Sequence, residues 1–349
     1  MRRSAPGFGL LLAVFLSGSA SLLSSDLAEA VNAYFSTPPA RDFSGTVLIA
    51  ERDQIRVLQS YGLAERNLGM ANQPDMLYRI GSLTKPFTAT AVLTLVQSGK
   101  IHLQDRIAEH IRGCPALWQD VTIENLLDHT SGIQDLFGEM RAVPLGDTQK
   151  EAARVMESSA HLALISKPGA TYRYSNFNYM LLGIMIEDIT GLGWEEYLRR
   201  YVIAPAGLKH TLYDDAWTVI PGRVSGYLLK EKQFRPIAYK DDAAYSAGGL
   251  LSSARDLLSF ARALFEHRLV NAELLAEMTR PRLGNYGLGL QIIELNGRLA
   301  YNHTGGTNGF ASHLQYYPRE QLTVVVLSNT EDEPVKKIAT DLASLALRP

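Results

Sequence analysis

The chain has 349 residues, of which 46% are hydrophobic and 20% charged, and its formal net charge is −2. A chain of this length and hydrophobic content can bury a large core, and it exceeds the size at which a core divides into two lobes. The near-neutral charge, without a dense run of Lys and Arg, argues against nucleic acid as a partner. The only cysteine, Cys114, excludes an intrachain disulfide, and we expect it to be buried as a small hydrophobe.

The first residues have the pattern of a secretory signal. Arg2 and Arg3 precede an apolar run at 8–16, which is too short for an ordinary membrane span. We expect a signal peptide of residues 1–20, ending at Ala20, with cleavage at 28–30 or an uncleaved anchor as alternatives. The mature protein would then be periplasmic or extracellular, with no stable membrane span after cleavage.

The next segments predict a helix, a pair of strands and a largely helical middle. In chain order, the patterns indicate a helix at 26–35, strands at 45–50 and 55–61 that turn at Arg52-Asp53, and a helix through the apolar stretch 86–96. The pattern then stays mainly helical to about residue 240, with Thr148-x-x-Glu151 as a capping box and Trp194 to Tyr201 inside another helix.

Strand patterns return in the last hundred residues. They predict strands at 286–294 and 298–301 around the tight turn Asn296-Gly297, strands at 312–317 and 322–327, and a closing helix at 333–347. We therefore expect the strands of both ends to share one antiparallel sheet. The sheet lobe would comprise about 26–81 and 241–349, the inserted helical lobe about 82–240, and the site would lie in the cleft between them.

The start of the helix at 86–96 has one notable pattern. Ser82 and Lys85 lie three residues apart, so both side chains fall on one helix face, where a neutral amine can take the hydroxyl proton. An exposed lysine, with a pKa of about 10.4, would stay charged at pH 7, so this interpretation requires a buried amine. The competing interpretation is a polar helix start with a capping serine and a solvated lysine. No other serine of the chain has a lysine three residues later.

Two further motifs follow in order. Tyr174-Ser175-Asn176 is the only Tyr-x-Asn of the chain, and His303-Thr304-Gly305-Gly306 ends a predicted strand. With Ser82 and Lys85, these motifs resemble those of the serine beta-lactamase and penicillin-binding protein superfamily, in its branch of class C beta-lactamases, D-alanyl-D-alanine carboxypeptidases and family VIII esterases (S12-like peptidases). The resemblance covers about residue 26 to the C-terminus. It implies an α+β, beta-lactamase-like (transpeptidase) fold, with an antiparallel sheet flanked by helices and an inserted, mainly helical lobe.

The resemblance also implies a role for each motif residue. Ser82 would attack a carbonyl and form an acyl-enzyme, while Lys85 and Tyr174 share the proton; which of the two is the formal base stays open. The backbone N–H groups of Ser82 and Gly306 would hold the oxyanion. Asn176 would orient the Lys85 amine and the substrate amide.

The strand motif departs from the family pattern. His303 stands where beta-lactamases and most D,D-peptidases carry a lysine that holds the substrate carboxylate, and a histidine is mostly neutral at pH 7. Thr304, Gly305 and Gly306 would complete the substrate-binding strand. We therefore expect a serine hydrolase for a small-molecule or peptide substrate, either an esterase or a D-amino-acid peptidase or carboxypeptidase, with weak or no beta-lactamase activity.

Several alternatives remain open from the sequence. The chain can be a non-catalytic penicillin-binding, sensing or structural homologue of the same fold, whereas an alpha/beta-hydrolase would need a Gly-x-Ser-x-Gly elbow that the chain lacks. His129 is a candidate base only in a Ser/His enzyme, and we interpret it as part of a helix end. The remaining histidines show no ligand spacing, so neither a metal nor a cofactor is expected. The loops at 137–147 and 213–239 should line the cleft, and the oligomeric state stays unknown.

Overall fold

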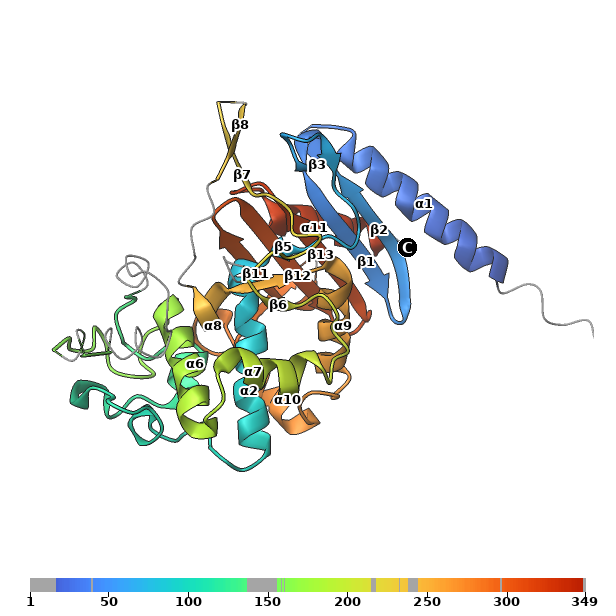
Figure 1. Cartoon of the computed structure of the whole chain (residues 1–349). Coiled ribbons are helices and arrows are strands. Elements are labelled where there is room, and N and C mark those ends of the chain that lie inside the picture. Colours follow the sequence, from blue (N-terminus) through green and yellow to red (C-terminus); the bar gives the residue numbers. More distant parts are fainter. Residues whose placement is uncertain are drawn as a thin grey trace, which may run out of the picture.

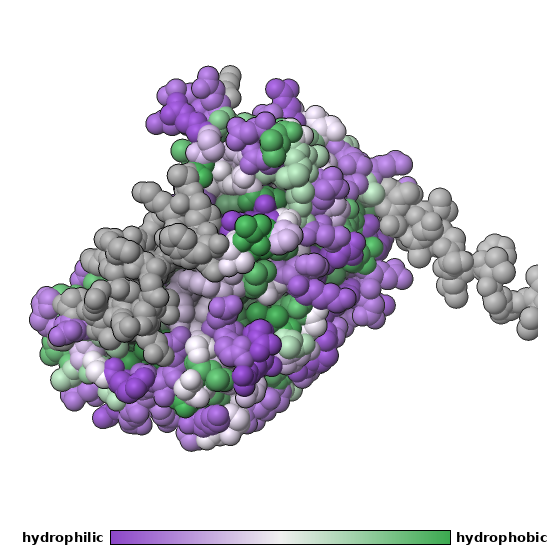
Figure 2. All heavy atoms as spheres, viewed as in Figure 1, coloured by the Kyte–Doolittle hydropathy of each residue, from purple (hydrophilic) through white to green (hydrophobic). Residues whose placement is uncertain are grey.

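A computed structural model describes residues 17–38, 40–136, 156–157, 159, 161–214, 218–231, 233–237, 244–295 and 297–347 (Figure 1). The run of the predicted signal at 8–16, the loop at 137–147, the capping box at 148–151 and the turn residue Asn296 lie outside the described residues. Within them, no helix combines the length and the apolar character needed to cross a bilayer. Hydrophilic residues cover much of the face seen in Figure 2, with hydrophobic ones in smaller groups between them.

The largest sheet is antiparallel, and its strands come from both ends of the chain. Its strand order is β10-β11-β12-β13-β1-β2. The bounds are Gly45–Glu51 for β1, Gln54–Tyr61 for β2, Gln291–Leu295 for β10, Arg298–Thr307 for β11, Phe310–Tyr317 for β12 and Leu322–Ser328 for β13. Strand β1 pairs with β13 along its whole length, from Gly45 opposite Ser328 to Glu51 opposite Leu322. The predicted union of the two ends in one antiparallel sheet is therefore confirmed.

Both faces of this sheet are buried, because successive side chains of a strand point to opposite faces. Val47 and Val324 belong to the core under α1 (Ser17–Phe35) and α11 (Val335–Ala346). Leu48 and Val325 belong to the larger core on the other face, which α9 (Ala254–Phe265) helps to cover. The predicted helices at 26–35 and 333–347 are thus confirmed, and the first of them begins earlier, at Ser17.

The larger core is built around helix α2, Thr84–Gln97, which contacts α6, α7 and α8 (Figure 1). The ring of Phe87 on α2 stacks on that of Phe260 on α9, with centroids 3.7 Å apart. The other α-helices are α3 Ile123–Leu127, α6 Asn176–Thr190, α7 Trp194–Leu198, α8 Tyr245–Gly248 and α10 Ala272–Met278. The short 3-10 helices are η1 Ala40–Asp42, η2 Gly81–Leu83, η3 Ile107–Glu109, η4 Ala116–Trp118 and η6 Leu283–Asn285. Segment η5, Arg199–Ile203, is a π-helix.

Short strands interrupt the segment predicted to be mainly helical. They are β6 Leu212–Tyr213, β7 Tyr227–Lys230 and β8 Gln233–Pro236; elsewhere β3 Leu63–Glu65 pairs with β4 Met70–Ala71, and β5 Tyr78–Arg79 and β9 Leu250–Ser252 form a small sheet with β6. The mainly helical prediction up to residue 240 is therefore wrong for its last part, and most described residues between α2 and α6 also lie in turns and loops rather than in helices. A two-residue strand such as β6 has no periodicity of its own and is defined only by its partner β9, which is remote in sequence.

The predicted strand at 286–294 is wrong in its first half. The chain makes a tight turn there, with the Gly287 N–H donating to the Leu290 carbonyl at 2.8 Å and Gly289 at a φ of +84°. Strand β10 begins only at Gln291. Tyr286, Leu288 and Leu290 alternate in sequence and are all buried, so this turn has the same apolar period as a strand.

Candidate active site

The turn η2 brings Ser82 to the start of α2. Its first residue, Gly81, has a φ of +50°, and a β-carbon there would lie 2.7 Å from the Gly306 carbonyl oxygen. Glycine alone combines this backbone conformation with so close an approach. The turn closes with the Leu83 N–H donating to the Ile80 carbonyl at 3.1 Å. The serine therefore sits on a short turn pressed against strand β11.

Lys85 lies one helical turn further on and is 0% exposed. Its Nζ is 3.0 Å from Ser82 Oγ and 2.8 Å from both Asn176 Oδ1 and the Ala247 carbonyl oxygen. Desolvation disfavours the charged amine and lowers the pKa of Lys85 to about 7, against a weaker opposite effect of Asp135. The structure thus places the amine where the sequence interpretation requires it, buried and beside the serine.

The second motif, Tyr174-Ser175-Asn176, lies at the start of helix α6. Ser175 is its N-cap, with its Oγ accepting the Asn178 N–H at 3.3 Å, so Asn176 opens the helix and Tyr174 immediately precedes the cap. The ring of Tyr174 lies with its centroid 4.8 Å from Lys85 Nζ. Tyr174 and Ser82 line the same cavity. Although 39% of Tyr174 is exposed, burial raises the pKa of its phenol above the ordinary value, because the phenolate would be poorly solvated.

Ala247 is a member of the site that the sequence analysis did not find. It lies on the four-residue helix α8, which is fixed on both sides: Thr88 Oγ1 donates to the Ser246 carbonyl at 2.7 Å, and Ser246 Oγ donates to the Tyr179 carbonyl at 2.9 Å. Ala247 contributes a backbone carbonyl to Lys85. Since any residue type can offer a carbonyl, no side-chain motif marks this position.

Strand β11 closes the site on the other side. A β-carbon on Gly305 would lie 1.9 Å from the Ile80 carbonyl oxygen, to which Ser312 Oγ also donates at 2.7 Å. A β-carbon on Gly306 would meet nothing within 4 Å, so that residue faces open space. A cavity of about 130 Å³ lies here, lined by Gly81, Ser82, Tyr174, Asn176, Ala244, Ala247, Gly248, Gly306, Thr307 and Asn308. Strand and helices thus meet at one small cavity around Ser82.

His303, Thr304 and Gly305 are not among the described residues that line this cavity. His303 is 3% exposed, and its Nδ1 donates to the Thr304 carbonyl at 2.8 Å. In the neutral ring Nε2 then carries no proton and accepts from the Tyr286 hydroxyl at 2.9 Å. Burial and the charge of Lys85 lower the pKa of His303 to about 3. The expectation of a neutral ring agrees with this geometry, but the expected direct contact of His303 with substrate does not.

The side chain of Thr304 lies away from the cavity, with its Oγ1 2.8 Å from His313 Nδ1. Gly305 packs against the carbonyl oxygen of Ile80. Of the predicted strand motif, only Gly306 reaches the cavity, whereas the three residues before it support the wall. These three residues instead contact other parts of the protein: His303 bonds to Tyr286, Thr304 to His313, and Gly305 packs on Ile80.

His129 and Tyr286 complete the wall behind Tyr174. The ring centroid of His129 lies 4.4 Å from that of Tyr174 and 4.8 Å from that of Tyr286. The sequence analysis set His129 aside as part of a helix end, and it does lie just after Asp128, the C-cap of α3. Its position against the phenol ring could not be inferred from the motif, since Tyr174 is remote in sequence.

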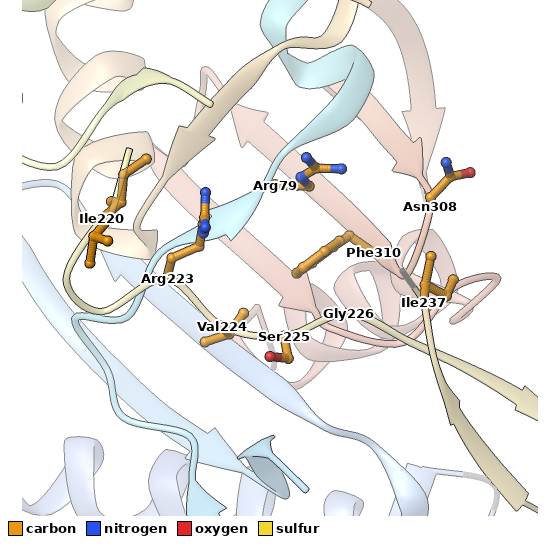
Figure 3. A pocket seen from close by; sticks show the side chains of 10 residues that line it. Arg79, Ile220, Arg223, Val224, Ser225, Gly226, Ile237, Asn308 and Phe310 are labelled. Carbon is orange, nitrogen blue, oxygen red and sulfur yellow. The ribbon is translucent and has the colours of Figure 1, made fainter. Parts of the chain in front are cut away.

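A second cavity, of about 340 Å³, adjoins the first through Asn308 (Figure 3). Part of the predicted loop at 213–239 lines it, including Ile220, Arg223 and Ile237, and the side chain of Phe310 forms another wall. Asp214 accepts from Arg79 and from Arg223. The loop at 213–239 therefore borders the neighbouring cavity, while the loop at 137–147 lies outside the described residues.

One group of side chains in the described ranges has donor atoms close enough for a metal ion. Asp105, Glu109 and His110 bring theirs within 4.8 Å of one another. Asp105 Oδ2 already lies 3.1 Å from His110 Nε2 and accepts the His102 N–H at 2.7 Å. Internal hydrogen bonds thus account for this group. Cys114 is half-buried nearby, and burial raises the pKa of its thiol to about 11, which leaves it a poor nucleophile.

The sequence of the chain is similar to those of known proteins along most of its length. A family model described as Beta-lactamase matches residues 31–348. Penicillin-binding protein 4* of Bacillus subtilis is 29% identical over 318 residues, which cover 83% of this chain and 69% of that protein.

Solved structures share the fold along almost the whole chain. A penicillin-binding protein from Bacillus halodurans is 25% identical, with a TM-score of 0.77 over 93% of this chain and 99% of the other. EstCE1, a hydrolase with promiscuous acyltransferase activity, has a TM-score of 0.80 over 95% of this chain and 100% of its own, at 18% identity. At that identity the likeness shows the fold alone. The mixed α+β, beta-lactamase-like fold is therefore confirmed.

Proposed function

Because the chain belongs to the beta-lactamase family, a family of serine hydrolases, we propose that it cleaves an ester or amide through an acyl-enzyme on Ser82. One observation carries the proposal. The Lys85 amine is fully buried 3.0 Å from Ser82 Oγ, and its pKa of about 7 leaves a large neutral fraction at physiological pH. A neutral amine at hydrogen-bond distance is what a serine hydroxyl needs to lose its proton during attack.

The hydrogen bonds of Lys85 also fix the direction of its lone pair. A neutral amine has two N–H groups and one lone pair. Asn176 Oδ1 and the Ala247 carbonyl can only accept, so they take the two N–H groups. The lone pair is left for the third neighbour, Ser82 Oγ, whose hydroxyl then donates to Lys85. Attack on the substrate carbonyl transfers this proton to the amine, and the resulting ammonium keeps the same three partners.

Tyr174 supplies the second proton-transfer group. Its raised pKa keeps the phenol neutral at pH 7, so it acts as a hydrogen-bond donor and proton relay beside Ser82. The leaving group takes a proton from the Lys85–Tyr174 pair, which titrates as one coupled unit. In deacylation a water molecule gives its proton to the same pair, and Ser82 Oγ departs as the hydroxyl.

The oxyanion of each tetrahedral intermediate needs donors that are already in place. We assign this role to the backbone N–H groups of Ser82 and Gly306, which belong to residues on facing walls of the cavity. The close packing of Gly81 and Gly305 between these walls supports the assignment, since it fixes the spacing of η2 and β11.

The shape and charge of the cavity favour small, uncharged groups next to the scissile bond. The described lining consists of glycine, alanine, short polar residues and Tyr174, with no Lys, Arg or His. His303 is neutral and lies behind the wall, so it provides no fixed cation for a carboxylate. We therefore propose short acyl esters, or D-amino-acid amides and peptides, as substrates, with weak or no beta-lactamase activity.

A hydrolysis panel tests this proposal. It comprises p-nitrophenyl acetate to octanoate, nitrocefin, and D-alanyl amides and dipeptides. We expect turnover of acetate or butyrate esters or of D-alanyl compounds, little turnover of nitrocefin, and loss of all activity in Ser82→Ala. Ser36→Ala, at an exposed serine, is the matched control. The second candidate is a penicillin-binding or sensing protein, which the likeness to penicillin-binding proteins favours. Labelling of Ser82 by a fluorophosphonate without turnover of any substrate in the panel would support it instead.

We further propose that the protein is exported and cleaved after Ala20. Leu27 on α1 is buried in the core beneath α11 together with Val31, so cleavage at 28–30 would remove a core residue. Cleavage after Ala20 leaves this packing intact. N-terminal sequencing of the protein secreted from a bacterial host should begin at Ser21; a start after residue 30, or retention in the membrane fraction, would contradict the proposal.

A further inference from the structure

His129 holds a backbone position that costs energy to maintain. It follows α3 with a φ of +61°, in the left-handed region that few residues other than glycine, asparagine, aspartate and histidine tolerate. It is 1% exposed, and its ring lies against Tyr174, Tyr179 and Tyr286, with centroids 4.4, 5.1 and 4.8 Å away. Strained and buried residues of this kind concentrate at functional sites.

His129 contacts the chain on both sides of Tyr174. Its carbonyl oxygen accepts the Arg173 N–H at 2.9 Å, and its Nδ1 accepts the Ser175 N–H at 3.2 Å. The residues before and after Tyr174 therefore both donate hydrogen bonds to His129. The ring of His129 lies beside the ring that these two bonds position.

These contacts specify the protonation state of the ring. Because Nδ1 accepts a hydrogen bond, the ring proton must be on Nε2. Nε2 is buried and has no hydrogen-bond partner among the described residues. A proton on Nδ1 would point at the Ser175 N–H, so the hydrogen bond from Ser175 to Nδ1 could not form. A buried donor without a partner is unfavourable for stability, so this ring is not explained by stability alone.

The surroundings keep the ring neutral. The titratable side chains packed against it are Tyr172, Tyr174, Tyr179 and Tyr286, all phenols. Desolvation is the largest effect on its pKa, and the charges of Lys85 and His303 act in the same direction, so the pKa of His129 lies well below its ordinary value. The bond from Ser175 is thus stable across the pH range in which Lys85 titrates.

We propose that His129 is a positioning residue for Tyr174: its neutral ring accepts the Ser175 N–H at Nδ1 and thereby fixes the phenol beside Ser82. The inference rests on the proposed catalytic role of Tyr174. It differs from a simple packing role, because it depends on one acceptor atom rather than on the volume of the ring.

Two substitutions separate the acceptor from the ring. His129→Asn places an amide oxygen near the position of Nδ1 and tolerates the positive φ, whereas His129→Phe keeps an aromatic ring and removes the acceptor. With p-nitrophenyl butyrate, we expect His129→Phe to lose about 100-fold in kcat with little change in KM, as misplacement of a catalytic group by about 1 Å can cost. His129→Asn should recover at least part of that loss.

The outcomes that overturn the inference are distinct from failure of the proposed function. A folded His129→Phe with the kcat of the wild type, or a folded His129→Asn as inactive as His129→Phe, would contradict the role of Nδ1 while Ser82-dependent turnover persists. Because phenylalanine is strained at this φ and the variant can fail to fold, a second measurement uses the wild type. Imidazole ¹⁵N chemical shifts should show His129 as the neutral Nε2–H tautomer from pH 5 to 9; a protonated Nδ1 would overturn the inference.

Discussion

Gly305 packs directly on the carbonyl of Ile80: a β-carbon added to the glycine would lie 1.9 Å from that oxygen. Ile80 is two residues before Ser82, so this contact sets the distance between strand β11 and the turn that carries the proposed nucleophile. The two proposed oxyanion donors lie on opposite sides of this junction, at Ser82 and Gly306.

Gly305→Ala should therefore impair catalysis through the spacing of the two walls. The new methyl group has to push β11 away from η2, and we expect kcat/KM for p-nitrophenyl butyrate to fall by about 100-fold, the scale of losing one oxyanion donor. Gly193→Ala is the matched control, since its β-carbon would meet nothing closer than 3.9 Å and its φ is −55°. Wild-type kcat/KM in Gly305→Ala would show that the contact does not govern the oxyanion site.

The pH dependence of activity should follow Lys85. The neutral amine is the active form and the pKa of Lys85 is about 7, so kcat/KM should rise with pH and level off above that value. On the acid side we expect a fall of about tenfold per pH unit below the inflection. Initial rates from pH 5 to 9 measure this. An inflection near 10, typical of an exposed lysine, would contradict the buried geometry.

The same shift predicts a dependence of stability on pH. Between about 7 and the ordinary 10.5, the unfolded chain carries a proton on Lys85 that the folded protein does not, so the unfolding free energy rises with pH in this window. Below pH 7 both states bind the proton, and the cost of burying the charge stays constant. The gain is at most about 1.4 kcal/mol per pH unit. Urea denaturation at several pH values gives the unfolding free energy of the wild type and of Lys85→Met as a function of pH. We expect this free energy to rise between pH 7 and 10.5 only in the wild type, and parallel pH dependences of the two proteins would contradict the prediction.

Tyr286→Phe should destabilise the protein by leaving His303 Nε2 buried without its donor. The Tyr286 hydroxyl lies 2.9 Å from that nitrogen, and both residues are buried. We expect a loss of about 1–3 kcal/mol in the free energy of unfolding. Tyr201→Phe, at a residue that is 45% exposed, should cost far less. Equal effects of the two substitutions in urea denaturation would mean that the hydrogen bond contributes nothing.

The parts of the site that the sequence predicts are those that depend on side-chain identity. Ser82 and Lys85 are close because a helical turn brings residues three apart together. Tyr174 and Asn176 are recognised from the Tyr-x-Asn pattern and the family resemblance that it carries, and the structure adds that Ser175 between them caps α6. These four side chains meet at one cavity or beside it, as the motifs suggest.

The remaining parts depend on backbone groups and on contacts between distant segments. The Ala247 carbonyl that holds Lys85 is 162 residues away in sequence, and any residue there can supply it. The burial of His303 behind the wall follows from its bond to Tyr286, in a segment that has the alternating pattern of a strand but folds as a turn. Only the tertiary packing distinguishes a histidine facing substrate from one bonded to a tyrosine.

The most direct test of the central claim is the site and rate of labelling by a fluorophosphonate, followed by mass spectrometry of the digested protein. We expect one adduct, on the peptide that contains Ser82, and a rate about 10²–10⁴-fold lower in Lys85→Arg, whose guanidinium stays protonated. Labelling at another residue, or an unchanged rate at Ser82 in a folded Lys85→Arg variant, would contradict activation of the serine by the buried amine.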